Sequence, residues 1–436
     1  MDELLHGFRI DHEACGGCFA CMRSCPTHAI RVRHGKAELL SELCIDCGTC
    51  LEACTCGAIA ARTSSIDEIG KFAYKVVVAS PVICSQFPAD VRPEHIVEGL
   101  LSVGFDVVWD YGVEIGLAAR AIADYVDRWR GPRPLISISC PVIVRLVQVS
   151  YPRMVEQLIP LQPPRELAGR EIKRRCPAEL GLAPEQVAAI YITPCQARTI
   201  SIIQPAEGGK SHLDGAVGIS EVYNAVLAGA RAAAKEGKQA SAPNIVRSAS
   251  MLRWSTSQAL ARRLVKHRYM SVTGLANVIQ VFDDVEKGKL RDIEFLECYG
   301  CWGGCTNGNL TVDNVYVSQA KLDGLMERYA EFDRDTEREV ERRFPHEDYT
   351  LERQVAPRRM RGVPGDLKER VRQVRHAEEV LGQLPGLDCG LCGAPSCKVL
   401  ARDVSRGEAA RTDCVFLSED RLTELKRLYL RTTSAK

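Results

Sequence analysis

The sequence predicts an α/β protein with a parallel sheet at its centre and a small cysteine-rich module at each end. Short apolar runs alternate with helical segments from Phe72 to about residue 320. Two evenly spaced cysteine runs precede this region, and a further group of cysteines follows it. We expect domains at residues 1–70, 71–320 and 379–436, with a charged helical linker at 321–378.

Composition excludes several classes of protein. The chain has 436 residues, 46% of them apolar, and its net charge of +1 gives no reason to expect nucleic-acid binding. No apolar run approaches the roughly 18 residues of a membrane span, and MDELLHGFRI lacks the basic start of a signal peptide. Its 20 cysteines therefore predict a cytoplasmic protein whose reduced thiols bind metal.

The first module carries two cysteine runs with the spacing of a two-cluster bacterial ferredoxin, an α+β domain. In that pattern the fourth cysteine of each run ligates the other cluster. The first cluster is predicted to use Cys15, Cys18, Cys21 and Cys54, and the second Cys44, Cys47, Cys50 and Cys25. Zinc is the alternative metal, but eight cysteines in two such runs exceed what zinc needs. Cys56 is an extra thiol that we expect to be a spare.

The central region alternates between expected strands and expected helices, which predicts a parallel sheet covered on both faces. The expected strands are Tyr74–Pro81, Phe105–Asp110, Pro134–Cys140, Val187–Cys195 and Asp292–Glu297. The expected helices are His95–Phe105, Ile115–Trp129 and Val142–Leu158.

Cysteines follow three of these strands. Cys140 precedes Pro141, Cys195 follows Pro194, and the glycine-rich stretch after Glu297 contains Cys301 and Cys305. Ligands bind beyond the carboxyl ends of parallel strands, so the four thiolates are expected to converge and hold a third [4Fe-4S] cluster. Cys84 and Cys176 lack such a setting, and we expect them to be buried small hydrophobic residues.

The end of the chain predicts a fourth [4Fe-4S] site in a small helical module, with Cys389, Cys392, Cys397 and Cys414 as its ligands. The charge-dense region 315–380 is expected to be solvated helix and linker. The segment from Ser418 predicts an amphipathic helix that docks on this chain or on a partner.

The three central cysteine segments resemble the signature loops of [FeFe]-hydrogenases in their order and context. These segments are Ile138–Leu146, Thr193–Arg198 and Glu297–Asn314, and Met270–Leu290 resembles the segment before the third loop. The layout is most similar to the sensory group of that family, whose members usually continue into a PAS domain. No PAS domain follows Cys414 in this sequence, so we expect any sensory output to come from another subunit.

The resemblance implies that Cys140, Cys195, Cys301 and Cys305 bind the [4Fe-4S] part of an H-cluster. Cys305 would also bridge to a two-iron subcluster that carries CO and cyanide. The residues to which it assigns catalytic roles are Cys305, Ser139 and Arg198, and we add Glu297 and Cys298 as another proton route.

The sequence departs from the family pattern at several positions. Ser139 replaces a proton-relaying cysteine, and Arg198 replaces a lysine that holds a cyanide ligand. Trp302 is expected to add bulk between two ligand cysteines. The other departures are Asn307 and Asn309 in the third loop, and Ala118, Ala119 and Arg120 where acidic proton carriers are common.

The sequence is compatible with three functions. The first is an enzyme that passes electrons along the clusters and interconverts protons and H2. The second is an electron-transfer subunit of a flavin-containing or bifurcating complex that holds only [4Fe-4S] clusters. The third is an H2 or redox sensor. Each requires other redox subunits or a ferredoxin as partners, and we expect a hetero-oligomeric complex, because no nucleotide-binding motif stands between a strand and a helix.

Overall fold

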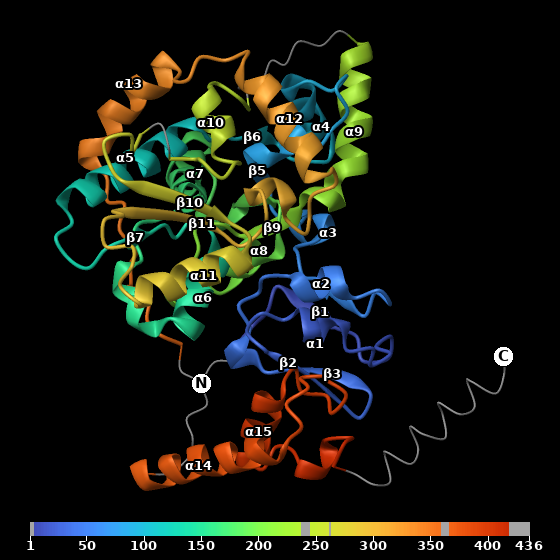
Figure 1. The fold of residues 1–436 in the computed structure, drawn as a ribbon. Helices are drawn as coiled ribbons and strands as arrows, with labels where there is room; N and C mark the ends of the chain where they lie inside the picture. The colour runs from blue at the N-terminus through green and yellow to red at the C-terminus, as the bar shows by residue number, and fades with distance from the viewer. Residues whose placement is uncertain (1–3, 237–244, 261–262, 359–365, 418–436) are drawn as a thin grey trace.

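The computed structural model describes residues 4–236, 245–260, 263–358 and 366–417. Three parts lie in one column, as Figure 1 shows. The large central α/β domain is at one end, the N-terminal ferredoxin-like domain (blue) is in the middle, and the C-terminal helices (orange and red) lie on its far side. The order in space therefore differs from the order in the sequence.

The ferredoxin-like domain consists of two small antiparallel sheets and short helices. Strand β1 (Phe8–Ile10) pairs with β4 (Ile59–Ala61), and β2 (Ile30–Arg33) forms a hairpin with β3 (Lys36–Leu39). His34 and Gly35 both have positive φ at the turn of this hairpin, which is the backbone of a tight two-residue hairpin loop. The helices of this region are α1 (Ala20–Ser24), α2 (Thr49–Ala53) and α3 (Ile66–Ile69).

The central domain contains two parallel sheets where the sequence led us to expect one. The larger has the order β6 (Val107–Val108), β5 (Tyr74–Ala79), β8 (Val187–Thr193) and β9 (Gly215–Gly218). The smaller has the order β10 (Tyr269–Thr273), β11 (Phe295–Tyr299) and β7 (Leu135–Ile136). Cys195 therefore follows a strand of one sheet, whereas Cys140 and Cys301 follow strands of the other.

Helices cover both faces of the larger sheet. Val77 and Ala79 face a core shared with α4 (Pro93–Ser102) and α9 (Ile219–Lys235). Val76 and Val78 face the opposite core, with α5 (Gly112–Arg128) and α7 (Pro164–Leu180). This alternation is the period of two that a strand buried on both faces requires.

The smaller sheet packs against α6 (Pro141–Ser150) and α11 (Leu275–Glu286), through residues such as Phe282 and Leu296. The remaining helices described are α8 (Gln196–Ile203), α10 (Ala249–Arg253), α12 (Val315–Met326), α13 (Arg334–Arg343), α14 (Leu367–Gln383) and α15 (Cys397–Ser405). Among the described residues, no helix combines the length and the apolar character that crossing a membrane would need.

Several expected elements are shorter than the sequence suggested. The strands expected at 105–110 and 134–140 are reduced to two residues each, and the helix expected to run to Leu158 ends at Ser150. Pro152 explains this end, because proline has no N–H and disfavours helical backbone at the residue before it. The helix expected from Ser418 lies outside the described residues.

The charge-dense region is more than solvated linker, which corrects our expectation. Helix α13 packs against α5, and its Arg343 is 9% exposed and forms ion pairs with Glu114 and Glu171. The charges in this region therefore include a buried network that attaches α13 to the central domain. Helix α14 begins before residue 378 and packs against α15 of the C-terminal module.

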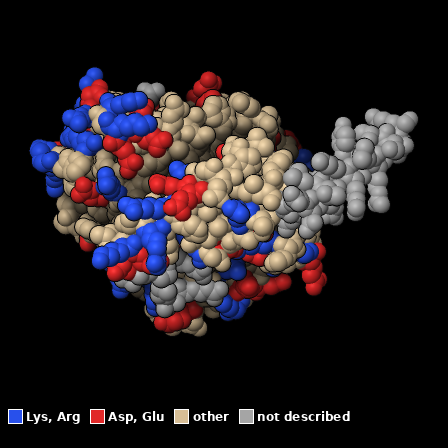
Figure 2. Space-filling view, turned by 60° about the horizontal axis from the view of Figure 1, so that its bottom comes forward, with Lys and Arg blue, Asp and Glu red and all other residues tan. Residues whose placement is uncertain are grey.

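The surface charges of the molecule are mixed in sign. Figure 2 shows acidic and basic side chains next to one another on the face that it presents, separated by areas of other residues. This mixing agrees with a net charge of +1. The charges on this face therefore give no sign of a partner as highly charged as a nucleic acid.

Candidate functional site

One buried cavity brings together the four central cysteines. Cys140, Cys195, Cys301 and Cys305 all line it, although they come from three segments and two sheets. Cys140 is the N-cap residue of α6 and Cys195 is the N-cap residue of α8, so two helices begin at the cavity. The partial positive charge of a helix N-terminus favours an anionic ligand there.

The third loop folds tightly to place its two cysteines. Cys301 follows β11 after Gly300, and Cys305 lies in a short helical turn at Gly304–Asn307. Gly303 and Gly304 have φ of +75° and +85°, a conformation that a side chain would strain. A Cβ on Gly308 would lie 2.2 Å from the carbonyl oxygen of Pro194, so this glycine permits the third loop to contact the second.

The chemistry of this donor set fits a [4Fe-4S] cluster. Burial raises the pKa of the Cys305 thiol to about 11, and the neighbouring thiols of Cys140 and Cys195 add to this effect. Burial also raises the pKa of Cys301 well above its usual value, and the same neighbours contribute. Buried thiolates packed this closely repel one another unless cations lie between them. Iron supplies such cations, and thiolate is the ligand that iron–sulfur clusters use.

Arg198 is the cation that the protein itself supplies to the cavity. It is 5% exposed, and its guanidinium donates hydrogen bonds to Cys305 Sγ at 3.0 Å and to the Tyr191 hydroxyl at 2.7 Å. Burial opposes its charge, but the attraction of Cys305 and Tyr191 keeps its pKa well above the usual value. The motif position had identified Arg198, whereas Tyr191 carried no signal beyond its place in a strand.

Glu297 and Cys298 lie on opposite faces of β11. Glu297 is 1% exposed, its Oε1 accepts a hydrogen bond from the Tyr299 hydroxyl at 2.8 Å, and Tyr299 lines the cavity. Burial raises the pKa of Glu297 to about 8. Cys298 instead belongs to the core between the smaller sheet and α6. Adjacent side chains of a strand point to opposite faces, and Cys140 and Glu297 are the charged neighbours of the Cys298 thiol, so a proton route through Glu297 and Cys298 stays a prediction.

Other predicted residues take positions that the sequence did not reveal. Ser139 stands next to Cys140 in the chain and accepts a hydrogen bond from the Ser137 hydroxyl at 3.0 Å. We expected Trp302 to add bulk between two ligand cysteines. It is instead 54% exposed and does not line the cavity. Cys84 and Cys176 are buried in hydrophobic cores, as expected.

In the ferredoxin-like domain most neighbouring thiols belong to the same predicted group, and the assignment of ligands to the two clusters stays a prediction. The thiols near Cys21 are those of Cys15, Cys18 and Cys54, and after burial they contribute to raising its pKa to about 11. Burial again is the largest cause of the raised pKa of Cys50, followed by the thiols of Cys47, Cys25 and Cys21, so Cys21 of the first predicted group also lies near the second. Cys44 belongs to this second group, because Cys47 and Cys50 are its neighbours.

The second ferredoxin site adjoins the central cavity. Cys47 lines the cavity together with the four central cysteines. Gln196 Nε2 donates to the Asp46 carbonyl oxygen at 3.0 Å, and Asn309 Nδ2 donates to Glu52 at 2.6 Å. Asn309, one of the departures from the family's third-loop pattern, thus joins the third loop to α2.

Asp46 is the buried centre of this contact. Its carboxylate pairs with Arg145 of α6, lies 3.3 Å from His6 Nδ1 and accepts the Gly7 N–H at 2.9 Å. Burial opposes ionisation of Asp46, but hydrogen bonding from His6 and the charge of Arg145 hold its pKa below the usual value. Asp46 and Arg145 were missed from the sequence, because an ion pair between residues 99 positions apart leaves no local pattern.

The C-terminal module gathers the last four cysteines around one small core. Cys392, Cys397 and Cys414 belong to this core. The thiols of Cys389 and Cys414 lie near Cys392 and, after burial, contribute to raising its pKa. Cys397 is the first residue of α15, whose N-cap Ser396 accepts a hydrogen bond from Val399 N at 3.3 Å. Asp388 also accepts the Cys397 N–H at 2.6 Å.

Comparisons with known proteins agree with this division. A family model described as the iron only hydrogenase large subunit, C-terminal domain, matches residues 73–226 and 220–309. A 4Fe-4S dicluster domain matches residues 8–55, and a model for an Fe-S cluster domain matches residues 384–416. Iron–sulfur domains thus flank the central region on both sides.

Similar proteins include Iron hydrogenase 1 of Clostridium pasteurianum, which is 22% identical over 264 residues. The match covers 51% of this chain and 46% of that protein, so the chain spans about half the length of this relative. A variant of [FeFe]-hydrogenase HydA1 from Chlamydomonas reinhardtii matches at 15% identity and a TM-score of 0.46. That match covers 65% of this chain and 91% of the other.

The first family model extends over more than half of the 436 residues. It includes four cysteines that line the central cavity: Cys140, Cys195, Cys301 and Cys305. The chain therefore belongs to the iron-only hydrogenase large-subunit family.

Proposed function

We propose that this chain is an [FeFe]-hydrogenase-type oxidoreductase that passes electrons along four [4Fe-4S] clusters to a site at Cys305. Protons and H2 are interconverted there. One observation carries the proposal: Cys140, Cys195, Cys301 and Cys305 line one buried cavity. A two-iron group that carries CO and cyanide, when bound at Cys305, supplies the chemistry of hydrogen.

The residues around the cavity hold and orient this chemistry. The four cysteines ligate the third [4Fe-4S] cluster, and the N-termini of α6 and α8 stabilise its negative charge. Arg198 fixes the sulfur of Cys305 and is the donor available to an anionic ligand there. Tight packing of Gly308 on Pro194 and burial of Cys305 exclude water from the sulfur.

Glu297 and Tyr299 are the best candidates for moving protons. At neutral pH Glu297 holds a proton, because its pKa is about 8. The Tyr299 hydroxyl bonds to Oε1 of this carboxyl group, and the Tyr299 side chain lines the cavity. Ser139, bonded to Ser137, is the second candidate, at the position where the resemblance places a relay cysteine.

One observation favours a second function, an electron-transfer subunit that holds only [4Fe-4S] clusters. The Arg198 guanidinium lies 3.0 Å from Cys305 Sγ, the sulfur at which a two-iron group would bridge. An arginine that occupies this position beside the sulfur suits a site with a cubane alone. Partners of either function are other redox subunits or a ferredoxin in a hetero-oligomeric complex.

An infrared spectrum of protein purified anaerobically from its native host separates the two functions. Metal-bound CO and cyanide absorb where protein groups hardly absorb. Under the first function we expect bands that disappear in Cys305→Ala and persist in Cys298→Ala, whose sulfur lies on the other face of β11. A blank spectrum from wild-type protein with about sixteen irons per chain, four cubanes, would leave the electron-transfer function.

A further inference from the structure

The C-terminal module is docked on the ferredoxin-like domain by specific contacts. Val32 N of β2 donates to the Gly393 carbonyl oxygen at 2.9 Å, so the last cysteine loop bonds to the backbone of a strand. Arg23 donates to the Cys389 carbonyl oxygen at 2.8 Å. Figure 1 shows the two parts in contact, far from the central domain's sheets.

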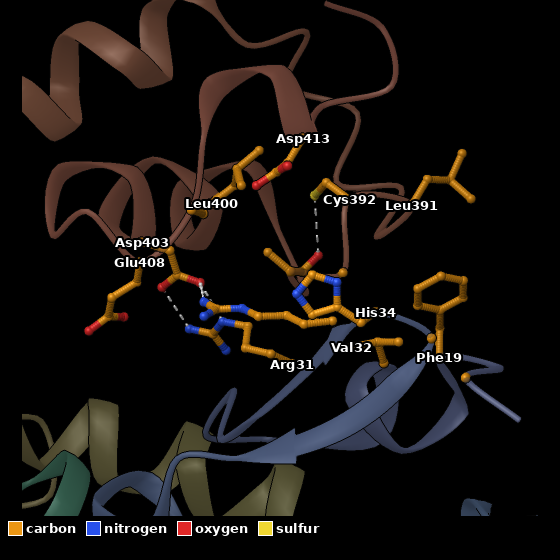
Figure 3. Close-up of a pocket in the computed structure, with 16 residues that line it drawn as sticks. Phe19, Arg31, Val32, His34, Leu391, Cys392, Leu400, Asp403, Glu408 and Asp413 are labelled. Carbon is orange, nitrogen blue, oxygen red and sulfur yellow. Dashed lines mark hydrogen bonds and ion pairs between the residues drawn. The ribbon is translucent and has the colours of Figure 1, made fainter. Parts of the chain in front are cut away.

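A buried ion pair fixes this docking. Arg31 Nε and Nη2 lie 2.6 and 3.1 Å from the two carboxylate oxygens of Asp403, and the two side chains are 5% and 3% exposed. Figure 3 shows Arg31 and Asp403 facing each other across the boundary between the parts. An arginine that bonds to both oxygens of a carboxylate fixes the relative orientation of the two parts as well as holding them together. A buried pair of this kind often adds little net stability, so we assign the Arg31–Asp403 pair the role of setting the geometry of the contact.

The docking places two cysteine loops against each other. A Cβ on Gly390 would lie 3.1 Å from Cε of Met22, the residue after Cys21. A Cβ on Gly393 would lie 1.8 Å from the Val32 carbonyl oxygen, so only glycine permits this approach. One cavity, shown in Figure 3, is lined by Phe19 from the first cysteine run and by Leu391 and Cys392 from the last module.

We propose that the cluster held by Cys389, Cys392, Cys397 and Cys414 exchanges electrons directly with the cluster held by Cys15, Cys18, Cys21 and Cys54. In each exchange one cluster loses one electron and the other gains it, while no bond breaks and no proton moves. The electron comes from a one-electron donor such as an iron–sulfur protein or a flavin semiquinone.

This proposal rests on the cluster assignment of the proposed function and adds an order to it. The C-terminal cluster, which is last in sequence, becomes the outer end of a chain that continues through the two ferredoxin sites to the central cavity. Cys47, of the second ferredoxin site, lines the cavity at the other end of this route.

Electron paramagnetic resonance of the reduced full-length chain tests the proposal. Clusters that exchange electrons directly lie close enough for their spins to interact, which splits and broadens their signals. We expect this spin interaction in the wild type. In the double variant Cys389→Ala/Cys392→Ala we expect the splitting caused by the fourth cluster to be lost. This variant should also hold about four fewer irons per chain. Arg31→Met should keep the iron and weaken the interaction, whereas Arg9→Met, a change at an exposed arginine of β1, should do neither.

Two results would overturn the proposal. One is a wild type without iron in the C-terminal module. The other is a double variant that lacks about four irons but has ferredoxin signals identical to those of the wild type. An unchanged interaction in Arg31→Met would overturn the role assigned to the Arg31–Asp403 pair in setting the docking. A blank infrared spectrum at the central site would alter none of these readouts, so the two proposals fail separately.

Discussion

The ferredoxin-like domain and the central domain assemble their cysteine sites in different ways. In the first, each predicted cluster takes three ligands from one short run, and one ligand, Cys18, is exposed. In the second, the ligands lie up to 165 positions apart, from Cys140 to Cys305, and approach one another only through two sheets. The central cavity is also nearer the molecule's interior, with Arg198 and Glu297 buried beside it.

The two kinds of site therefore depend on different parts of the molecule. A run of cysteines at fixed spacing folds around its cluster with little help from distant residues. The central site depends on the packing of the loops after β7, β8 and β11, and on the contact with the ferredoxin-like domain at Asp46. Changes in packing should therefore disturb the central site more than the ferredoxin sites.

The largest expected effect is loss of the central cluster alone. Cys301→Ala should remove the central cubane, about four irons per chain, together with any two-iron group at Cys305, and leave the ferredoxin signals intact, because the two kinds of predicted site share no ligand. Iron analysis and paramagnetic resonance measure this. Cys298→Ala is the matched control, since Cys298 is three positions away and faces the core. Equal iron loss in both variants would mean that the sites fold as one unit.

The next largest effect concerns the contact between the two domains. Arg145→Met leaves the buried Asp46 carboxylate without its arginine, and breaking a buried pair in this way costs about 3–5 kcal/mol. We expect a lower midpoint of anaerobic guanidinium unfolding, followed through the cluster absorption. Arg153→Met, a change at an exposed arginine soon after α6, is the control. An unchanged midpoint in Arg145→Met would show that the domains hold together without this pair.

A smaller effect is expected in the pH dependence of stability. Here Glu297, a buried carboxyl of the central domain, should differ from Glu13, an exposed carboxyl of the ferredoxin-like domain. The pKa of Glu297 is about 8 in the folded chain and 4.5 ordinarily, so the folded state binds the proton more tightly. Stability contributed by this group is complete below pH 4.5 and is lost as the pH rises to about 8.

Glu297→Gln should therefore remove this decline from the unfolding midpoint measured between pH 5 and 9. Glu13→Gln, at an exposed position near the first cluster, should leave it in place. If the Glu297→Gln profile parallels the wild type, the carboxyl group does not hold its proton at neutral pH.

The smallest expected effect is at Cys56. This thiol is exposed, and its sulfur lies 3.7 Å from Cys54 Sγ, so it is the one ferredoxin cysteine whose place the spacing leaves open. Cys56→Ser should keep the iron content of the wild type, while Cys54→Ser should lose about four irons per chain. The opposite result would make Cys56 the ligand and Cys54 the spare.

Much of the site could be predicted because cysteine spacing is a local property. The meeting of Cys140, Cys195, Cys301 and Cys305 agrees with the observed cavity, and the neighbours of Cys21 agree with the expected first group, although Cys21 also lies near Cys50. The alternation of strands and helices also predicted the α/β class. The division into two sheets was not predictable, because strand pairing is decided by contacts between distant segments.

By itself, the sequence determined which residues are available to bind metal and in which loops they lie, since motif spacing and chain periodicity are written along the chain. Only the tertiary structure decided that Arg198 contacts Cys305, that Cys298 packs into the core behind β11 and that Asp46 meets Arg145. It also decided that the last module docks beside the first. The physical reason is the same in each case: burial, side-chain direction and ion pairing arise from packing between segments that are remote in sequence.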